Sequence, residues 1–115
     1  MKGRVNVSKY RNRKTCIEGE VFDSVKESQR WMELRLLQAA GEITNLDRQV
    51  KYTLIPAQKR NGHVERPVIY VADFQYEENG EIIVEDVKSD ATKTREYVIK
   101  RKLMLWQYGI VVKEV

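Results

Sequence analysis

Residues 70–88 read YVADFQYEENGEIIVEDVK, and we expect the fold to form around them. Two runs rich in strand-forming residues flank the dipeptide Asn79-Gly80. Asn-Gly between such runs is the strongest short-range signal for a β-hairpin, because both central residues of a type I′ turn need φ > 0. With this pair at the centre of the turn, Glu78 faces Glu81, and the register of both strands follows.

This register brings two aspartates together. Asp73 falls opposite Asp86, and Lys88 projects from the same face of the hairpin. Like charges opposite one another repel, so two such carboxylates share a proton or hold a cation. Mg²⁺ binds through one or two carboxylates and keeps several waters, and a neighbouring lysine can orient a nucleophilic water or steady charge on a phosphate. The hairpin therefore predicts a divalent-cation site, and a slip by one residue would separate its ligands.

The other face of the hairpin is apolar. In this register it carries Tyr70, Ala72, Phe74, Tyr76, Ile83 and Val87, which we expect in the core. Glu85 lies opposite Phe74 on the same side. We therefore expect Glu85 to form an ion pair or to lie at a strand edge, and not to bind a metal.

The sequence Asp73…Asp86-Val87-Lys88 resembles the PD-(D/E)XK signature of the restriction-endonuclease-like nucleases. The wider chain, from Tyr10 to its end, resembles a small phage-encoded family of Holliday-junction-resolvase-like proteins in that superfamily. The resemblance is carried by four blocks in order: Val21-Phe22-Asp23-Ser24 with Glu27, Tyr70-Val71-Ala72-Asp73-Phe74, Val84-Glu85-Asp86-Val87-Lys88, and a helix rich in Lys and Leu. Three positions depart from the pattern: Ala72 replaces Pro, Asp86 replaces the commoner Glu, and Ser89 stands where the family often has Gly.

The resemblance implies an α/β (α+β) fold in the order α-β-β-β-α-β, with a mixed sheet flanked by helices. It implies an endonuclease that cuts branched DNA in phage recombination or replication, and a homodimer, because two strands must be cut. Asp73, Asp86 and the carbonyl of Val87 would bind Mg²⁺ or Mn²⁺. Lys88 would orient the attacking water. Lys100, with Arg101 beside it, would contact the cleaved strand.

Glu27 has two interpretations. Ser24 and Glu27 form the capping-box pattern of a helix start, which would occupy the glutamate as a cap. In the resembling nucleases a glutamate of the first helix completes the metal site, and Glu27 is the matching position. Both roles remain open at this point.

Local patterns predict the remaining elements. A helix is expected over 25–40, with Met32, Leu36 and Ala39 on its apolar face beside Val25; Trp31, Leu34 and Leu37 widen that face. Strands are expected over 50–57, 68–76 and 110–115, and a second Asn-Gly turn over 59–63. A second helix, capped by Thr92 or Thr94, should run to Tyr108 with a stripe of Ile99, Leu103 and Trp106, joined by Met104 and Leu105.

The composition is that of one soluble domain. The 115 residues are 33% charged with a net charge of +4, and six basic residues precede the first acidic one, Glu18. We divide the chain into a basic arm over 1–17 and a nuclease domain over 18–115. The arm is either a solvated tail or a phosphate-contacting segment in which Lys9, Arg11, Arg13 and Lys14 bind DNA. The lone Cys16, and the lack of a membrane-spanning or signal-like apolar run, lead us to expect a cytoplasmic protein.

Two other functions fit the same residues. The chain could be a non-catalytic nucleic-acid-binding module that kept the fold, although retention of all three of Asp73, Asp86 and Lys88 argues against this. Alternatively, it is a nuclease that acts on ordinary duplex or flap DNA.

Overall fold

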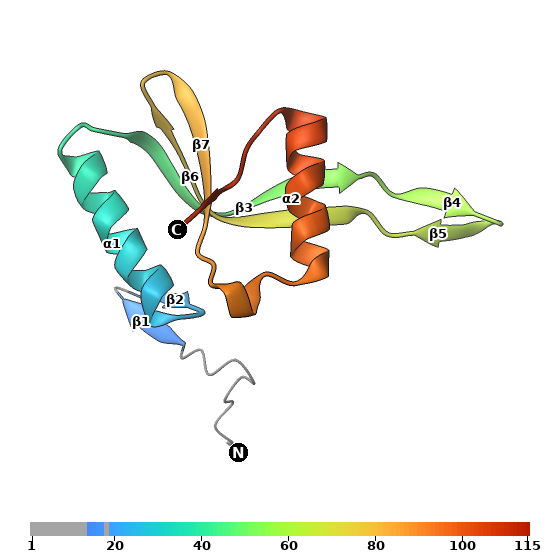
Figure 1. Ribbon diagram of the computed structural model, residues 1–115, viewed down its shortest axis with the longest axis horizontal. Coiled ribbons are helices and arrows are strands. Elements are labelled where there is room, and N and C mark those ends of the chain that lie inside the picture. The colour runs from blue at the N-terminus through green and yellow to red at the C-terminus, as the bar shows by residue number, and fades with distance from the viewer. Residues whose placement is uncertain (1–13, 18) are drawn as a thin grey trace, which may run out of the picture.

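The computed structural model describes residues 14–17 and 19–115. It forms an α+β domain, drawn in Figure 1. The elements in chain order are β1 (Thr15–Ile17), β2 (Glu20–Phe22), α1 (Val25–Ala39), β3 (Thr44–Ile55), β4 (Gln58–Arg60), β5 (His63–Glu65), β6 (Val68–Glu78), β7 (Glu81–Asp86), the 3-10 turn η1 (Asp90–Thr92), α2 (Arg95–Tyr108) and β8 (Lys113–Glu114). No helix among the described residues is long and apolar enough to cross a membrane.

The central sheet has the strand order β3-β6-β7-β8. The first three strands are antiparallel neighbours, and β8 returns parallel to β7 after α2. A parallel neighbour needs a crossover connection, which α2 supplies. The predicted order α-β-β-β-α-β and the mixed sheet are therefore confirmed. Two short hairpins, β1–β2 and β4–β5, are additions, and Figure 1 shows β4–β5 projecting away from the helices.

The hairpin between β6 and β7 has the predicted register. Glu78 pairs with Glu81, Tyr76 with Ile83, and Phe74 with Glu85. Asn79 and Gly80 have φ values of 52° and 79°, as a turn with two left-handed central residues requires. The second Asn-Gly turn is also present, between β4 and β5. His63, the single histidine of the sequence, directly follows this turn and is exposed.

Two apolar clusters form the core, one for each helix. Trp31 and Leu34 of α1 pack with Ile83, while Tyr97 and Met104 of α2 pack with Val84. Ile83 and Val84 are neighbours on β7 and point to opposite faces, so the helices cover opposite faces of this strand. Figure 1 accordingly shows α1 and α2 on either side of the central strands.

The four apolar residues predicted for one face of β6 are all buried, but they divide between these clusters. Tyr70 and Ala72 belong to the α2 cluster, whereas Phe74 and Tyr76 belong to the α1 cluster. Asp73 therefore lies at the point where β6 passes from one cluster to the other.

The predicted apolar faces of both helices are only partly confirmed. Leu34 and Met104 are buried as expected, and Trp31 and Leu103 pack against the core, but other predicted members are exposed. In α1, Val25, Met32 and Leu36 are exposed, and the buried side consists of Glu27, Ser28 and Leu34. In α2, Ile99 and Trp106 are exposed, and the buried residues are Tyr97 and Met104. In α1 the polar residues Glu27 and Ser28 take part of the buried side, so hydrophobic spacing alone placed some residues on the wrong face.

The boundaries of three predicted segments also change. β3 begins at Thr44, well before the predicted start of that strand, and the last strand is limited to Lys113–Glu114. Thr15–Ile17 pairs with β2, so the end of the predicted basic arm is part of a hairpin. Lys9, Arg11 and Arg13 lie outside the described residues.

Candidate metal centre

Four of the predicted site residues line one cavity of about 410 Å³, whereas Glu27 and Val87 lie outside its lining. Asp73 from β6, Asp86 from β7, Lys88 from the following loop and Lys100 from α2 all line it. The other lining residues are Asp23, Gln49, Ile69, Tyr70, Val71, Thr94, Glu96 and Tyr97. The cavity thus forms where the ends of two strands meet the start of α2.

The two aspartates are held directly against one another. The backbone N–H of Asp73 donates to Asp86 Oδ1 at 3.3 Å, and the N–H of Val87 donates to Asp73 Oδ2 at 2.8 Å. The hydroxyl of Tyr70 donates to Asp86 Oδ2 at 2.7 Å, and Asp86 is only 4% exposed. Burial, together with the neighbouring Asp86 carboxylate, raises the pKa of Asp73 to about 7. The negative charges of Asp73 and Asp86 therefore repel one another, as expected from the register.

Glu27 faces this pair from the first turn of α1 and is 3% exposed. Its backbone N–H donates to the Ser24 hydroxyl at 3.1 Å, which is half of a capping box. The side chain does not complete the box, because Glu27 Oε1 accepts from the N–H of Asp23 at 3.4 Å. Burial, followed by the charges of Asp73 and Asp23, raises the pKa of Glu27.

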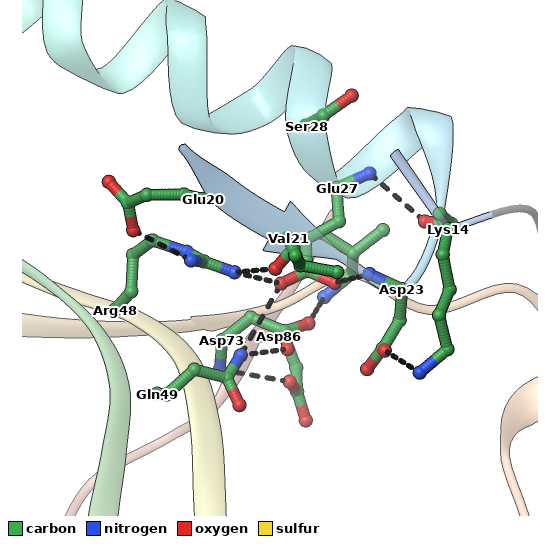
Figure 2. A network of polar contacts seen from close by, with 12 residues as sticks. Lys14, Glu20, Val21, Asp23, Glu27, Ser28, Arg48, Gln49, Asp73 and Asp86 are labelled. Atoms are coloured by element: carbon green, nitrogen blue, oxygen red, sulfur yellow. Dashed lines mark hydrogen bonds and ion pairs between the residues drawn. The ribbon is translucent and has the colours of Figure 1, made fainter. Parts of the chain in front are cut away.

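The second oxygen of Glu27 is contacted by two consecutive residues of β3. Arg48 Nη2 and Gln49 Nε2 each lie 3.4 Å from Glu27 Oε2. Gln49 Nε2 also lies 3.5 Å from Asp73 Oδ1 (Figure 2). Glu27 is thus both at the helix start and in a polar network that reaches Asp73.

Arg48 ties the first hairpin to the same network. It donates to Glu20 Oε1 at 2.8 Å and to the carbonyl of Val21 at 3.1 Å (Figure 2). Its guanidinium lies 3.8 Å from the centre of the Phe22 ring. Its Nε is buried and, among the described residues, has no hydrogen-bond partner.

The basic residues of the site differ in their surroundings. Lys88 Nζ lies 4.3 Å from the centre of the Tyr97 ring. Its charge acts to lower the pKa of Asp73, but burial raises that pKa by more. Lys100 lines the cavity and pairs with Glu96 at 3.0 Å. Arg101, in contrast, is absent from the cavity lining and pairs with Glu114 at 2.7 Å. Lys14 is exposed, 3.9 Å from Asp23.

Glu85 is not part of the site. It is fully buried, and Arg30 donates to both of its oxygens at 2.8 and 2.7 Å. Burial alone would raise the pKa of Glu85, but the hydrogen bonds from Arg30 and from the Tyr76 hydroxyl outweigh it and lower the pKa. The expected ion pair is confirmed.

The donor set fits a hard divalent cation held by few protein ligands. Among residues 14–17 and 19–115, no group of three or more His, Cys, Asp or Glu side chains is arranged as a closed metal site. Mg²⁺ needs no such group, since it binds through one or two carboxylates and retains its waters. Asp73 and Asp86 would supply two such carboxylates, and Glu27 would complete the site directly or through water.

Sequence reasoning missed four contributors to this site. Tyr70 was expected only in the core, and Arg48, Gln49 and Tyr97 were not singled out. Strand alternation gives no signal for Arg48 and Gln49, because consecutive strand residues normally point to opposite faces. Their convergence on Glu27 depends on a backbone feature of β3 that the amino-acid pattern does not encode.

Comparison with known families gives one result. Residues 7–114 match the model of the family described as "Protein of unknown function (DUF1064)". No curated protein and no solved structure matches the chain. Since the match covers nearly the whole sequence, the chain belongs to the DUF1064 family.

Proposed function

We propose that the protein is a metal-dependent endodeoxyribonuclease that hydrolyses phosphodiester bonds. The observation that carries this proposal is the placement of Asp86 against Asp73, whose side chains meet in a cavity that Lys88 also lines. A half-buried and a buried carboxylate side by side repel one another, and a bound cation would remove this electrostatic cost. Ionisable groups with strongly shifted pKa values cluster at catalytic sites, which favours an enzyme.

The chain's own residues have distinct roles in this proposal. Asp73, Asp86 and the carbonyl of Val87 would hold Mg²⁺ or Mn²⁺, which supplies Lewis acidity and lowers the pKa of a bound water. Lys88 would orient the attacking water and offset negative charge on the phosphate. Glu27 would complete the metal site directly or through water.

Lys100 is the candidate for contact with the cleaved strand, because it lines the cavity beside Lys88. Its pairing with exposed Glu96 is a surface ion pair of small energy, so a phosphate can replace that partner. Arg101 is a weaker candidate, since its guanidinium already donates to Glu114 and packs on the Tyr97 ring.

The resemblance to phage-encoded nucleases further suggests the substrate and the assembly. We propose branched DNA, such as a Holliday junction, cut by a homodimer in the cytoplasm of the host cell. Lys9, Arg11, Arg13 and Lys14 would add contacts to backbone phosphates.

A cleavage assay tests the proposal. A labelled four-way junction and a plain duplex of the same sequence are incubated with the protein, with and without Mg²⁺. We expect symmetric, metal-dependent nicking of the junction. A Lys88→Met variant should not cut, whereas Lys102→Met, which alters an exposed lysine of α2, should cut normally.

The other outcomes separate the alternatives. Equal cutting of both substrates would indicate a general nuclease. Binding without cutting, in Mg²⁺ and in Mn²⁺, would indicate a non-catalytic nucleic-acid-binding module and would contradict the proposed activity.

A further inference from the structure

Gln49 has an unusual backbone conformation for its place in the fold. It lies within β3, yet its φ is +53°, in the left-handed region that residues with a side chain rarely adopt. The register runs from Arg48 opposite Phe74 to Val50 opposite Ala72 without a shift, which puts Gln49 opposite Asp73. No inserted residue therefore accounts for the conformation. Strained backbone of this kind gathers at functional sites.

The conformation has a consequence for the direction of two side chains. In a regular strand, Arg48 and Gln49 would point to opposite faces. Here both reach the same carboxylate oxygen, Glu27 Oε2, each at 3.4 Å. The left-handed turn of the chain at Gln49 thus allows consecutive residues to converge on Glu27 (Figure 2).

The carboxamide of Gln49 also joins two carboxylates from different elements. Its Nε2 lies 3.4 Å from Glu27 of α1 and 3.5 Å from Asp73 Oδ1 of β6. An amide NH₂ has two hydrogens, so it can donate one to each acid. The donor is neutral. It can orient both carboxylates without cancelling the negative charge that attracts a cation, which a lysine at this place would do.

We propose that Gln49 is a positioning residue of the cation site. It holds the Glu27 and Asp73 carboxylates on one amide group, so that Glu27 faces the cation site formed by Asp73 and Asp86. This inference rests on the proposed function, because it assumes that Asp73 and Asp86 bind a divalent cation.

The test is Mn²⁺ binding by calorimetry, with thermal unfolding of the metal-free protein measured in parallel. Two variants remove the amide: Gln49→Gly, which also relieves the left-handed φ, and Gln49→Met, which keeps the length of the side chain. Asn45→Gly is the matched control. Asn45 is another residue of β3 with a positive φ, 55°, but its side chain donates to Glu77 instead of the site.

We expect both Gln49 variants to bind Mn²⁺ at least about 10-fold more weakly, the usual effect of losing a group that orients metal ligands. Metal-free Gln49→Gly should unfold at the same or a higher temperature than the wild type, and Asn45→Gly should bind Mn²⁺ normally. Unchanged Mn²⁺ affinity in Gln49→Gly or in Gln49→Met would overturn the role of Gln49. Absence of Mn²⁺ binding by the wild type would instead overturn the proposed metal site, and this inference with it.

Discussion

Replacing Asp73 with Asn should make the metal-free protein more stable at alkaline pH, although it removes a residue of the proposed active site. Asn has the shape of a neutral aspartic acid. Its carbonyl can still accept from the N–H of Val87, and its NH₂ can donate to the Asp86 carboxyl beside it. The substitution therefore removes one of two charges in contact while keeping their hydrogen bonds.

The magnitude follows from the pKa of Asp73. A rise from 3.8 to about 7 corresponds to roughly 4 kcal/mol, at about 1.36 kcal/mol for each pH unit. The sign is set by linkage. Because the folded state holds the proton more tightly than the unfolded state, stability is fully present below pH 3.8 and is lost as the pH rises through about 7. Solvent around this half-buried carboxyl reduces the effect, so we expect a gain of about 2 kcal/mol at pH 8.

Thermal unfolding without metal, at pH 8 and at pH 5, measures this gain. About 2 kcal/mol corresponds to a rise in Tm of roughly 8–16 °C for a domain of this size. The gain should be about a third as large at pH 5, which lies only about 1.2 pH units above the ordinary pKa of 3.8, so that most of the wild type's loss of stability has yet to occur. Asp47→Asn, at an exposed position of β3, is the control and should change the Tm little at either pH. A Tm for Asp73→Asn at or below that of the wild type at pH 8, or an equal gain at both pH values, would refute the reasoning.

Three further predictions concern catalysis, the core and the arm. Asp86→Asn should abolish cleavage of a four-way junction while leaving its binding in a gel-shift assay nearly intact, because the basic contacts remain; a variant that cuts normally would place the site elsewhere. Arg30→Ala should lower the free energy of unfolding by about 3–5 kcal/mol in urea titrations, because it leaves Glu85 buried without its main partner; a loss below about 1 kcal/mol would contradict this. Deletion of residues 1–14 should flatten the dependence of DNA affinity on salt, because fewer counterions are released; an unchanged slope would show that the arm does not contact phosphates.

The parts of the fold set by local geometry were predictable from the sequence. Asn79-Gly80 determines the turn, the turn determines the register, and the register brings Asp73 against Asp86. The order of helices and strands followed in the same way, because each element carries its own pattern and turn signals.

The parts set by tertiary contacts were not predictable. Met32 and Leu36 of α1 stay exposed while Glu27 is buried, because Glu27 takes part in the polar network that reaches Asp73 through Gln49. The positive φ of Gln49 likewise has no local signal, since glutamine is not a residue that favours the left-handed region. Buried Glu27 and left-handed Gln49 both belong to the candidate site, where contacts between polar side chains override the local preferences of the chain.

The central claim is that Asp73 and Asp86 together hold one divalent cation. Anomalous diffraction from crystals of the protein grown with Mn²⁺ tests it directly. The account predicts a single strong anomalous peak within coordination distance of a carboxylate oxygen from each aspartate, and no such peak in crystals of Asp86→Asn. A peak at other residues, or none at saturating Mn²⁺, would contradict it.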